Sequence, residues 1–188
     1  MNGNILSSDR GVGAHTKHLF DNTIGKVVTC NECHIEPATG FSDPSHIDNT
    51  PGAEIVFGSL SKLQTNVPNS FNYQPGIGDF NPIPGFDVSI GSCSNVYCHG
   101  YFKNGNLNNV VLFTAQSQGA ACGTCHGDPA TGNPLPITIA QGGSHPSTQN
   151  CAQCHRDVVQ ITNGVYTIID KNKHINGKLN VFGEEFNF

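Results

Sequence analysis

The stretch Cys151-Ala152-Gln153-Cys154-His155 decides the fold of this chain, because its pattern of two cysteines followed at once by a histidine recurs along the sequence. The same spacing is found from Cys30 to His34 and from Cys122 to His126. A longer version, with four residues between its cysteines, runs from Cys93 to His99. These four motifs use all 8 cysteines of the chain.

A cysteine pair that leads directly into a histidine is typical of covalent haem attachment. Each thiol forms a thioether to one haem vinyl group, and the adjacent histidine is carried under the iron as the proximal axial ligand. The sequence therefore predicts four covalent haems c. Their attachment residues are Cys30, Cys33, Cys93, Cys98, Cys122, Cys125, Cys151 and Cys154, and their proximal ligands are His34, His99, His126 and His155.

Disulfides, zinc sites and dithiol redox centres are the alternative uses of so many cysteines. A disulfide framework gives no reason for a histidine after every second cysteine. A zinc interpretation requires cysteine pairs that converge two at a time. The sequence favours haem attachment over all three.

Five further histidines, His15, His18, His46, His145 and His174, are available as distal ligands for four irons. We rank His174, His145 and His18 first, with His15 and His46 as the contested pair. Met1 is the only methionine, so we expect bis-histidine rather than His/Met ligation. With every iron capped on both sides, we expect electron transfer and no enzymatic activity. A multihaem reductase with an accessible iron is the alternative from another class.

The composition predicts a protein whose core is made by its haems. Of the 188 residues only 36% are hydrophobic, Trp is absent, and Gly 22 and Pro 11 favour turns over long regular elements. We expect a mostly irregular multihaem cytochrome c fold with few short helices and β-hairpins, as one domain over residues 1–188. The net charge of −5 speaks against a nucleic-acid partner, and no run is long enough for a membrane span.

Three segments stand out along the chain. The N-terminal arm, residues 1–25, contains a short helical stretch with His15 and His18 on one face, so we expect these two to serve different haems. Residues 59–92 lack Cys and His and are expected to form a long surface excursion, in which Phe71, Tyr73, Phe80 and Phe86 cover haem edges. A docking surface with these aromatics as contacts is the alternative. Asn163-Gly164 between two β-branched runs predicts a hairpin.

Other local patterns predict strands and internal repeats. Phe86, Val88 and Ile90 alternate as in a strand, and the apolar tail from Val181 to Phe188 is expected to dock on the protein. Pro-Ala-Thr-Gly follows the first and third motifs at the same offset, at 37–40 and 129–132. His46 and His174 each precede an apolar run, 55–58 and 181–183, which indicates a module used twice.

These motifs resemble those of multihaem cytochromes from metal-reducing bacteria that mix C-x-x-C-H with C-x-x-x-x-C-H. The resemblance rests on residues 92–100, on His145-Pro146 and on residues 174–177. In size and haem count the chain is most similar to tetrahaem extracellular cytochrome filaments of the OmcE type. The resemblance implies a homopolymer in which His15 or His18 ligates a haem of the next subunit.

The same resemblance implies where the protein works and with what. Covalent haem attachment of this kind takes place outside the cytoplasm, so we expect an exported protein, although residues 1–4 lack the features of a secretory signal. An extracellular or cell-surface location is expected, with the periplasm as the alternative. Expected partners are copies of itself, other redox proteins and extracellular electron acceptors. A monomeric periplasmic shuttle is the alternative to the filament.

Overall fold

The computed structural model describes residues 5–20, 23–40, 43–44, 52–65, 80–115, 118–143 and 145–187. Within them the backbone is mostly irregular, with few short helices and small antiparallel strand pairs. This confirms the predicted fold class of a single small domain. Phe71 and Tyr73, with most of the centre of the expected surface excursion, lie outside the described residues, as does His46.

The regular elements are all five residues or shorter. The helices are α1 (His15–Leu19) and α2 (Cys151–Cys154), with 3-10 turns η1 (Cys30–Glu32), η2 (Tyr97–His99), η3 (Gln118–Ala120) and η4 (Ile139–Gln141). The strands are β1 (Gly85–Asp87), β2 (Ser92–Ser94), β3 (Val111–Leu112), β4 (Val159–Thr162), β5 (Val165–Ile168), β6 (Lys178–Val181) and β7 (Glu184–Asn187). They pair as β1-β2-β3, β4-β5 and β6-β7.

The first and fourth cysteine motifs wind into single helical turns for a local reason, whereas the third, Cys122 to His126, forms an irregular turn. In the first motif the His34 N–H donates to the Cys30 carbonyl at 2.9 Å, and in the fourth the His155 N–H donates to Cys151 at 2.8 Å. Five residues are thus one closed turn, which places the histidine on the same face as the first cysteine. In these two motifs the turn therefore fixes the relative placement of thiol and imidazole.

The predicted hairpin at Asn163-Gly164 is confirmed. Strands β4 and β5 pair antiparallel from Val159 opposite Ile168 to Thr162 opposite Val165. Both turn residues have positive φ, 53° and 78°, as a type I′ turn requires.

The expected strand from Phe86 to Ile90 is too long. Strand β1 ends at Asp87, because the Asp87 carboxylate accepts both the backbone N–H and the hydroxyl of Ser89 and turns the chain there. This is the local competition by which Asp side chains favour turns over strands. Alternation of apolar residues alone did not reveal it.

The C-terminal tail docks on the protein by forming a hairpin. Strands β6 and β7 form a second hairpin, with Lys178 opposite Asn187 and Val181 opposite Glu184. Phe182 and Gly183 make its turn, with φ of 56° and 89°. The backbone N–H of Phe182 also donates to the Cys154 carbonyl at 2.7 Å, which ties this turn to the fourth motif.

The polypeptide by itself buries few apolar side chains. Among the described residues the buried hydrophobic ones are Ala14, Val96, Tyr97, Val158 and Val181. Many large hydrophobic side chains stay exposed, including Ile5, Phe20 and Ile83 at 84%, 80% and 78%. A domain of this length normally buries a continuous apolar core. The apolar interior that the protein part lacks is consistent with a core supplied by prosthetic groups.

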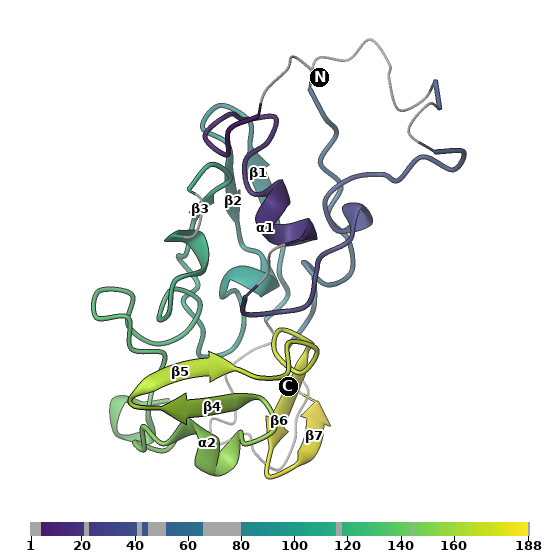
Figure 1. Cartoon of the computed structure of the whole chain (residues 1–188). Helices are drawn as coiled ribbons and strands as arrows, with labels where there is room; N and C mark the ends of the chain where they lie inside the picture. Colours follow the sequence, from purple (N-terminus) through teal and green to yellow (C-terminus); the bar gives the residue numbers. More distant parts are fainter. Residues whose placement is uncertain are drawn as a thin grey trace.

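The N-terminal and C-terminal elements of the chain occupy opposite ends of the molecule (Figure 1). Figure 1 shows α1 beside β1 and β2 at one end of the molecule, and α2 with the β4-β5 and β6-β7 hairpins at the other. The first motif is therefore near the α1 end and the fourth near the hairpin end. None of the helices in the described part of the chain has the length and hydropathy needed to cross a membrane.

Candidate haem sites

The four motif histidines each face one histidine from elsewhere in the chain. The ring centroids of these pairs lie 6.0 to 6.3 Å apart. We name the resulting sites by motif order: site 1 is Cys30, Cys33 and His34 with His15; site 2 is Cys93, Cys98 and His99 with His18; site 3 is Cys122, Cys125 and His126 with His174; site 4 is Cys151, Cys154 and His155 with His145.

This separation matches two imidazoles on opposite sides of one metal ion. With a metal–nitrogen bond of about 2.0 Å and a ring nitrogen about 1.1 Å from the centroid, two coaxial imidazoles have centroids about 6.2 Å apart. Direct ring packing has no reason to give this value four times. All four sites thus fit a haem iron between two histidines.

The hydrogen bonds of the eight rings leave the correct nitrogen free for iron. In seven of them Nδ1 lies within hydrogen-bond distance of a backbone carbonyl oxygen. The acceptors belong to Val12 for His15, Ala14 for His18, Glu54 for His34, Pro134 for His126, Pro146 for His145, Asn180 for His155 and Ile24 for His174. A carbonyl oxygen only accepts, so Nδ1 carries the proton and Nε2 keeps its lone pair for a metal.

Burial keeps several of these rings neutral, as iron ligation requires. Removal from water is the main cause that lowers the pKa of His18, His126, His155 and His174. At His99 burial lowers the pKa to about 4. Each of these five imidazoles is therefore unprotonated at neutral pH, before any metal is bound.

A cavity of about 420 Å³ lies at site 2. Its walls include His18, Cys93, Cys98 and His99, together with Cys122 and Cys125 of site 3. The volume falls in the range of cofactor pockets, and the lining is mainly apolar. The long motif is thus compatible with haem attachment in the same way as the short ones.

Sites 1 and 2 adjoin through α1 and through Glu32. His15 and His18 are three residues apart on one helix, which places their Cβ atoms about 5–6 Å apart. Glu32, inside the first motif, accepts the N–H groups of Leu60 and Ser61 at 2.9 and 3.3 Å. The Ser61 carbonyl in turn accepts the N–H of Tyr97 in the long motif at 3.0 Å.

Sites 2 and 3 are joined by the loop between their motifs. Asn106 Nδ2 donates to the carbonyls of Gly123 and Thr124 at 2.8 and 2.9 Å, and Asn109 Nδ2 donates to the His99 carbonyl at 2.8 Å. Cys125 Sγ lies 3.8 Å from the Cys98 carbonyl oxygen. The two motifs are therefore in direct contact.

Sites 3 and 4 are neighbours through their histidines. Burial is the main cause that lowers the pKa of His126. The same pKa is lowered further by three nearby rings, those of His174, His145 and His155. His155 acts in the same direction on the pKa of His174, again after burial. The four sites thus adjoin in sequence order, from site 1 at the α1 end to site 4 at the hairpin end.

The internal repeat predicted around residues 55–58 and 181–183 has a structural counterpart. At site 1, His34 Nδ1 donates to the Glu54 carbonyl and the Val56 N–H donates to the Cys33 carbonyl. At site 4, His155 Nδ1 donates to the Asn180 carbonyl and the Phe182 N–H donates to the Cys154 carbonyl. Each segment thus holds one motif by two bonds placed two residues apart. The repeated unit is a clamp on a motif histidine, used at sites 1 and 4.

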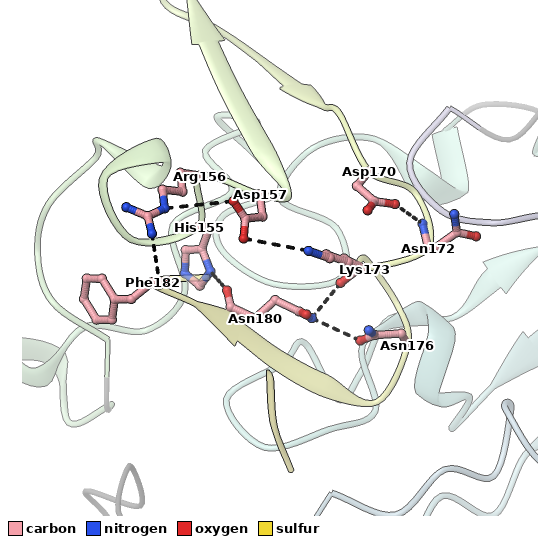
Figure 2. Close-up of polar contacts among 9 residues, drawn as sticks. All are labelled: His155, Arg156, Asp157, Asp170, Asn172, Lys173, Asn176, Asn180 and Phe182. Carbon is pink, nitrogen blue, oxygen red and sulfur yellow. Dashed lines mark hydrogen bonds and ion pairs between the residues drawn. The ribbon is translucent and has the colours of Figure 1, made fainter. Parts of the chain in front are cut away.

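Figure 2 shows how the clamp at site 4 is supported. The imidazole of His155 points at the Asn180 backbone oxygen, 2.6 Å away, while the Asn180 side chain donates to the carbonyl of Lys173 and to Asn176 Oδ1. Lys173 also forms an ion pair with Asp157 at 3.7 Å. The position of the His155 ring is therefore set by a network of polar contacts.

In the single chain, His15 and His18 lie at different sites, as expected: His15 faces His34 and His18 faces His99. Ligation of a neighbouring subunit by either ring stays a prediction. Of the contested pair, His15 joins site 1, and His46 lies outside the described residues. The remaining ranked histidines, His145 and His174, face His155 and His126.

Sequence reasoning did not identify the groups that orient the rings. Most are backbone carbonyls, which carry no residue signature. The His145-Pro146 pair did mark one of them, because the Pro146 carbonyl is the acceptor for His145. Asn106 and Asn109 were also missed, since one Asn among many gives no signal that its side chain links two motifs. All eight cysteines are unbridged, and no group of three or more His, Cys, Asp or Glu in the described ranges converges as a zinc site would require.

Comparison with known proteins gives a family match to part of the chain. A family model described as the Geobacter CxxxxCH...CXXCH motif matches residues 92–126, which hold the long motif and the third motif. No curated protein and no solved structure matches the chain. With the ring geometry above, the match identifies the segment from Ser92 to His126 as a pair of multihaem c-type cytochrome motifs.

Proposed function

We propose that this chain is an electron carrier that holds four haems c, each between two histidines of the same chain. The observation that carries the proposal is the set of four histidine pairs at 6.0 to 6.3 Å, one for each cysteine motif. The haem iron supplies the chemistry by taking up and giving up one electron. The chain supplies thioether attachment, axial ligands and spacing.

The ligand arrangement favours electron transfer over catalysis. A haem enzyme that binds a small substrate needs an open or displaceable axial position, whereas here each motif histidine has an opposing imidazole. Two imidazoles held by hydrogen bonds would keep the same positions on either side of a haem iron when it gains or loses an electron. The proximity of each site to the next gives a path through the molecule from site 1 to site 4.

Two measurements on the mature protein test this proposal. A pyridine haemochrome assay is expected to give four haems per chain, and the reduced protein is expected to show no spectral change with carbon monoxide. Fewer haems, or carbon monoxide binding at a substantial fraction of them, would contradict it. A site open to carbon monoxide would instead support the reductase alternative.

We further propose that the protein assembles with copies of itself into an extracellular filament, on the resemblance of its motifs to filament-forming tetrahaem cytochromes. In this proposal, one of His15 and His18 would exchange its partner in its own chain, His34 or His99, for the matching motif histidine of the next subunit. Negative-stain microscopy of the purified protein is expected to show filaments. Discrete particles at every concentration would support the monomeric shuttle.

A further inference from the structure

His99 differs from the other axial ligands in its hydrogen bonding. Its Nδ1 is buried and has no hydrogen-bond partner, whereas the other seven rings each have a carbonyl acceptor. The Gly119 backbone is close enough to oppose the effect of burial on the pKa of His99, but it does not meet hydrogen-bond geometry. Buried polar atoms in native proteins are rarely unpaired, so this one needs a functional explanation.

The missing bond changes the electronic character of the ligand. An N–H donated to a carbonyl raises the basicity of an imidazole and stabilises the more positive, ferric state of an attached iron. Without an acceptor, His99 is the weaker donor. The ferrous state at this site is correspondingly favoured.

Burial acts in the same direction. Val96 and Tyr97, which precede Cys98 and His99 in the long motif, are only 7% and 5% exposed. A water-poor environment disfavours the extra positive charge of ferric iron. Solvation of the more oxidised state is therefore poor at site 2.

The charges on the cavity wall add to both effects. The walls of the site 2 cavity include Lys17 and Lys26. Cationic side chains favour the state with one electron more. Glu32 lies near Cys98 and opposes this, but its carboxylate accepts the N–H groups of Leu60 and Ser61, which offset part of its charge.

From these three observations we infer that site 2, the long motif with His18, holds the haem of highest reduction potential among the four. This inference rests on the proposed function and adds to it an order of reduction. When the protein accepts its first electron, ferric iron at site 2 becomes ferrous and the external donor loses one electron. Site 2 adjoins both site 1 and site 3, so the first electron would be held at an inner site of the path and not at either end.

The test is a redox titration of the mature tetrahaem protein followed by proton NMR of the haem methyl groups. Val111 lies opposite Cys93 in the strand pair β2-β3, so nuclear Overhauser contacts to its methyl groups identify the site 2 haem. These signals are expected to be the first to change from ferric to ferrous as the potential is lowered. Any other haem reduced first would overturn the inference.

A pair of charge variants provides a second, milder test. Lys17→Gln removes a cation from the cavity wall and is expected to lower the site 2 midpoint more than the other three. Lys171→Gln removes an equal charge at the hairpin end and is expected to leave the site 2 midpoint unchanged. A Lys17→Gln effect that spares site 2 would contradict the inference. The haemochrome count and carbon monoxide binding test the proposed function separately from this inference.

Discussion

At the scale of single residues, the assignment of His174 to site 3 can be tested by removing it. In His174→Ala the iron opposite His126 loses its distal ligand, so we expect one of four haems to become high-spin and to bind carbon monoxide, with the haem count unchanged. The amount of carbon monoxide bound per chain measures this directly.

The matched control is His46→Ala. Because the four described pairs already account for every motif histidine, we expect this variant to bind no carbon monoxide. Binding in His46→Ala would mean that His46 is an axial ligand and that one of the four pairs is not.

The angle between the two rings of each pair predicts a spectroscopic pattern. The imidazole planes are 28° apart at site 1 and 12° apart at site 4, but 81° and 77° apart at sites 2 and 3. Near-parallel imidazoles split the two iron orbitals that interact with their π systems, whereas near-perpendicular ones leave them close in energy. We therefore expect two ferric haems with ordinary rhombic EPR spectra and two with a strongly shifted low-field signal. Four equivalent spectra would contradict the ring geometry.

At the scale of elements, the β4-β5 hairpin depends on a backbone conformation that Gly164 adopts easily. Its φ is 78°, and a Cβ placed there would meet nothing within 4 Å, so Gly164→Ala adds strain without a clash. The left-handed conformation costs a non-glycine residue roughly 1–2 kcal/mol. We expect the free energy of unfolding to fall by about that amount in denaturant titrations of the haem protein.

Asn163→Gly is the control for this hairpin, because glycine also accepts the φ of 53° at that position. We expect a change of only a few tenths of a kcal/mol. A large loss in Asn163→Gly, or none in Gly164→Ala, would show that the turn conformation does not limit stability.

The elements also show how far the sequence could predict this protein. The turn at Asn163-Gly164 and the winding of Cys151 to His155 follow from neighbouring residues, so local rules were sufficient. The early end of β1 at Asp87 depended on one side chain that outcompeted an alternating pattern. The pairing of His145 with His155 and of His174 with His126 could not be predicted, because it depends on which loops pack together.

At the scale of the whole molecule, each site depends on a distant segment. His174 near the C-terminal end caps site 3 while its Nδ1 bonds the Ile24 carbonyl near the N-terminal end, and Tyr97 of the long motif accepts the N–H of Gly177 at 3.0 Å. The segment that completes site 3 therefore also touches site 2 and the N-terminal arm. A haem bound between His126 and His174 would hold all three together.

This dependence predicts that the chain does not fold without its haems. Only five hydrophobic side chains are buried in the described part of the chain, whereas 17 large ones are exposed, so the polypeptide alone has too little apolar burial to offset the entropy of ordering. A variant with all eight cysteines changed to serine cannot attach haem. We expect it to give a collapsed amide proton spectrum and no cooperative unfolding transition, while the tetrahaem protein gives dispersed signals and a cooperative one. A dispersed spectrum for the haem-free chain would show that the histidine pairs are organised by the polypeptide and only then filled.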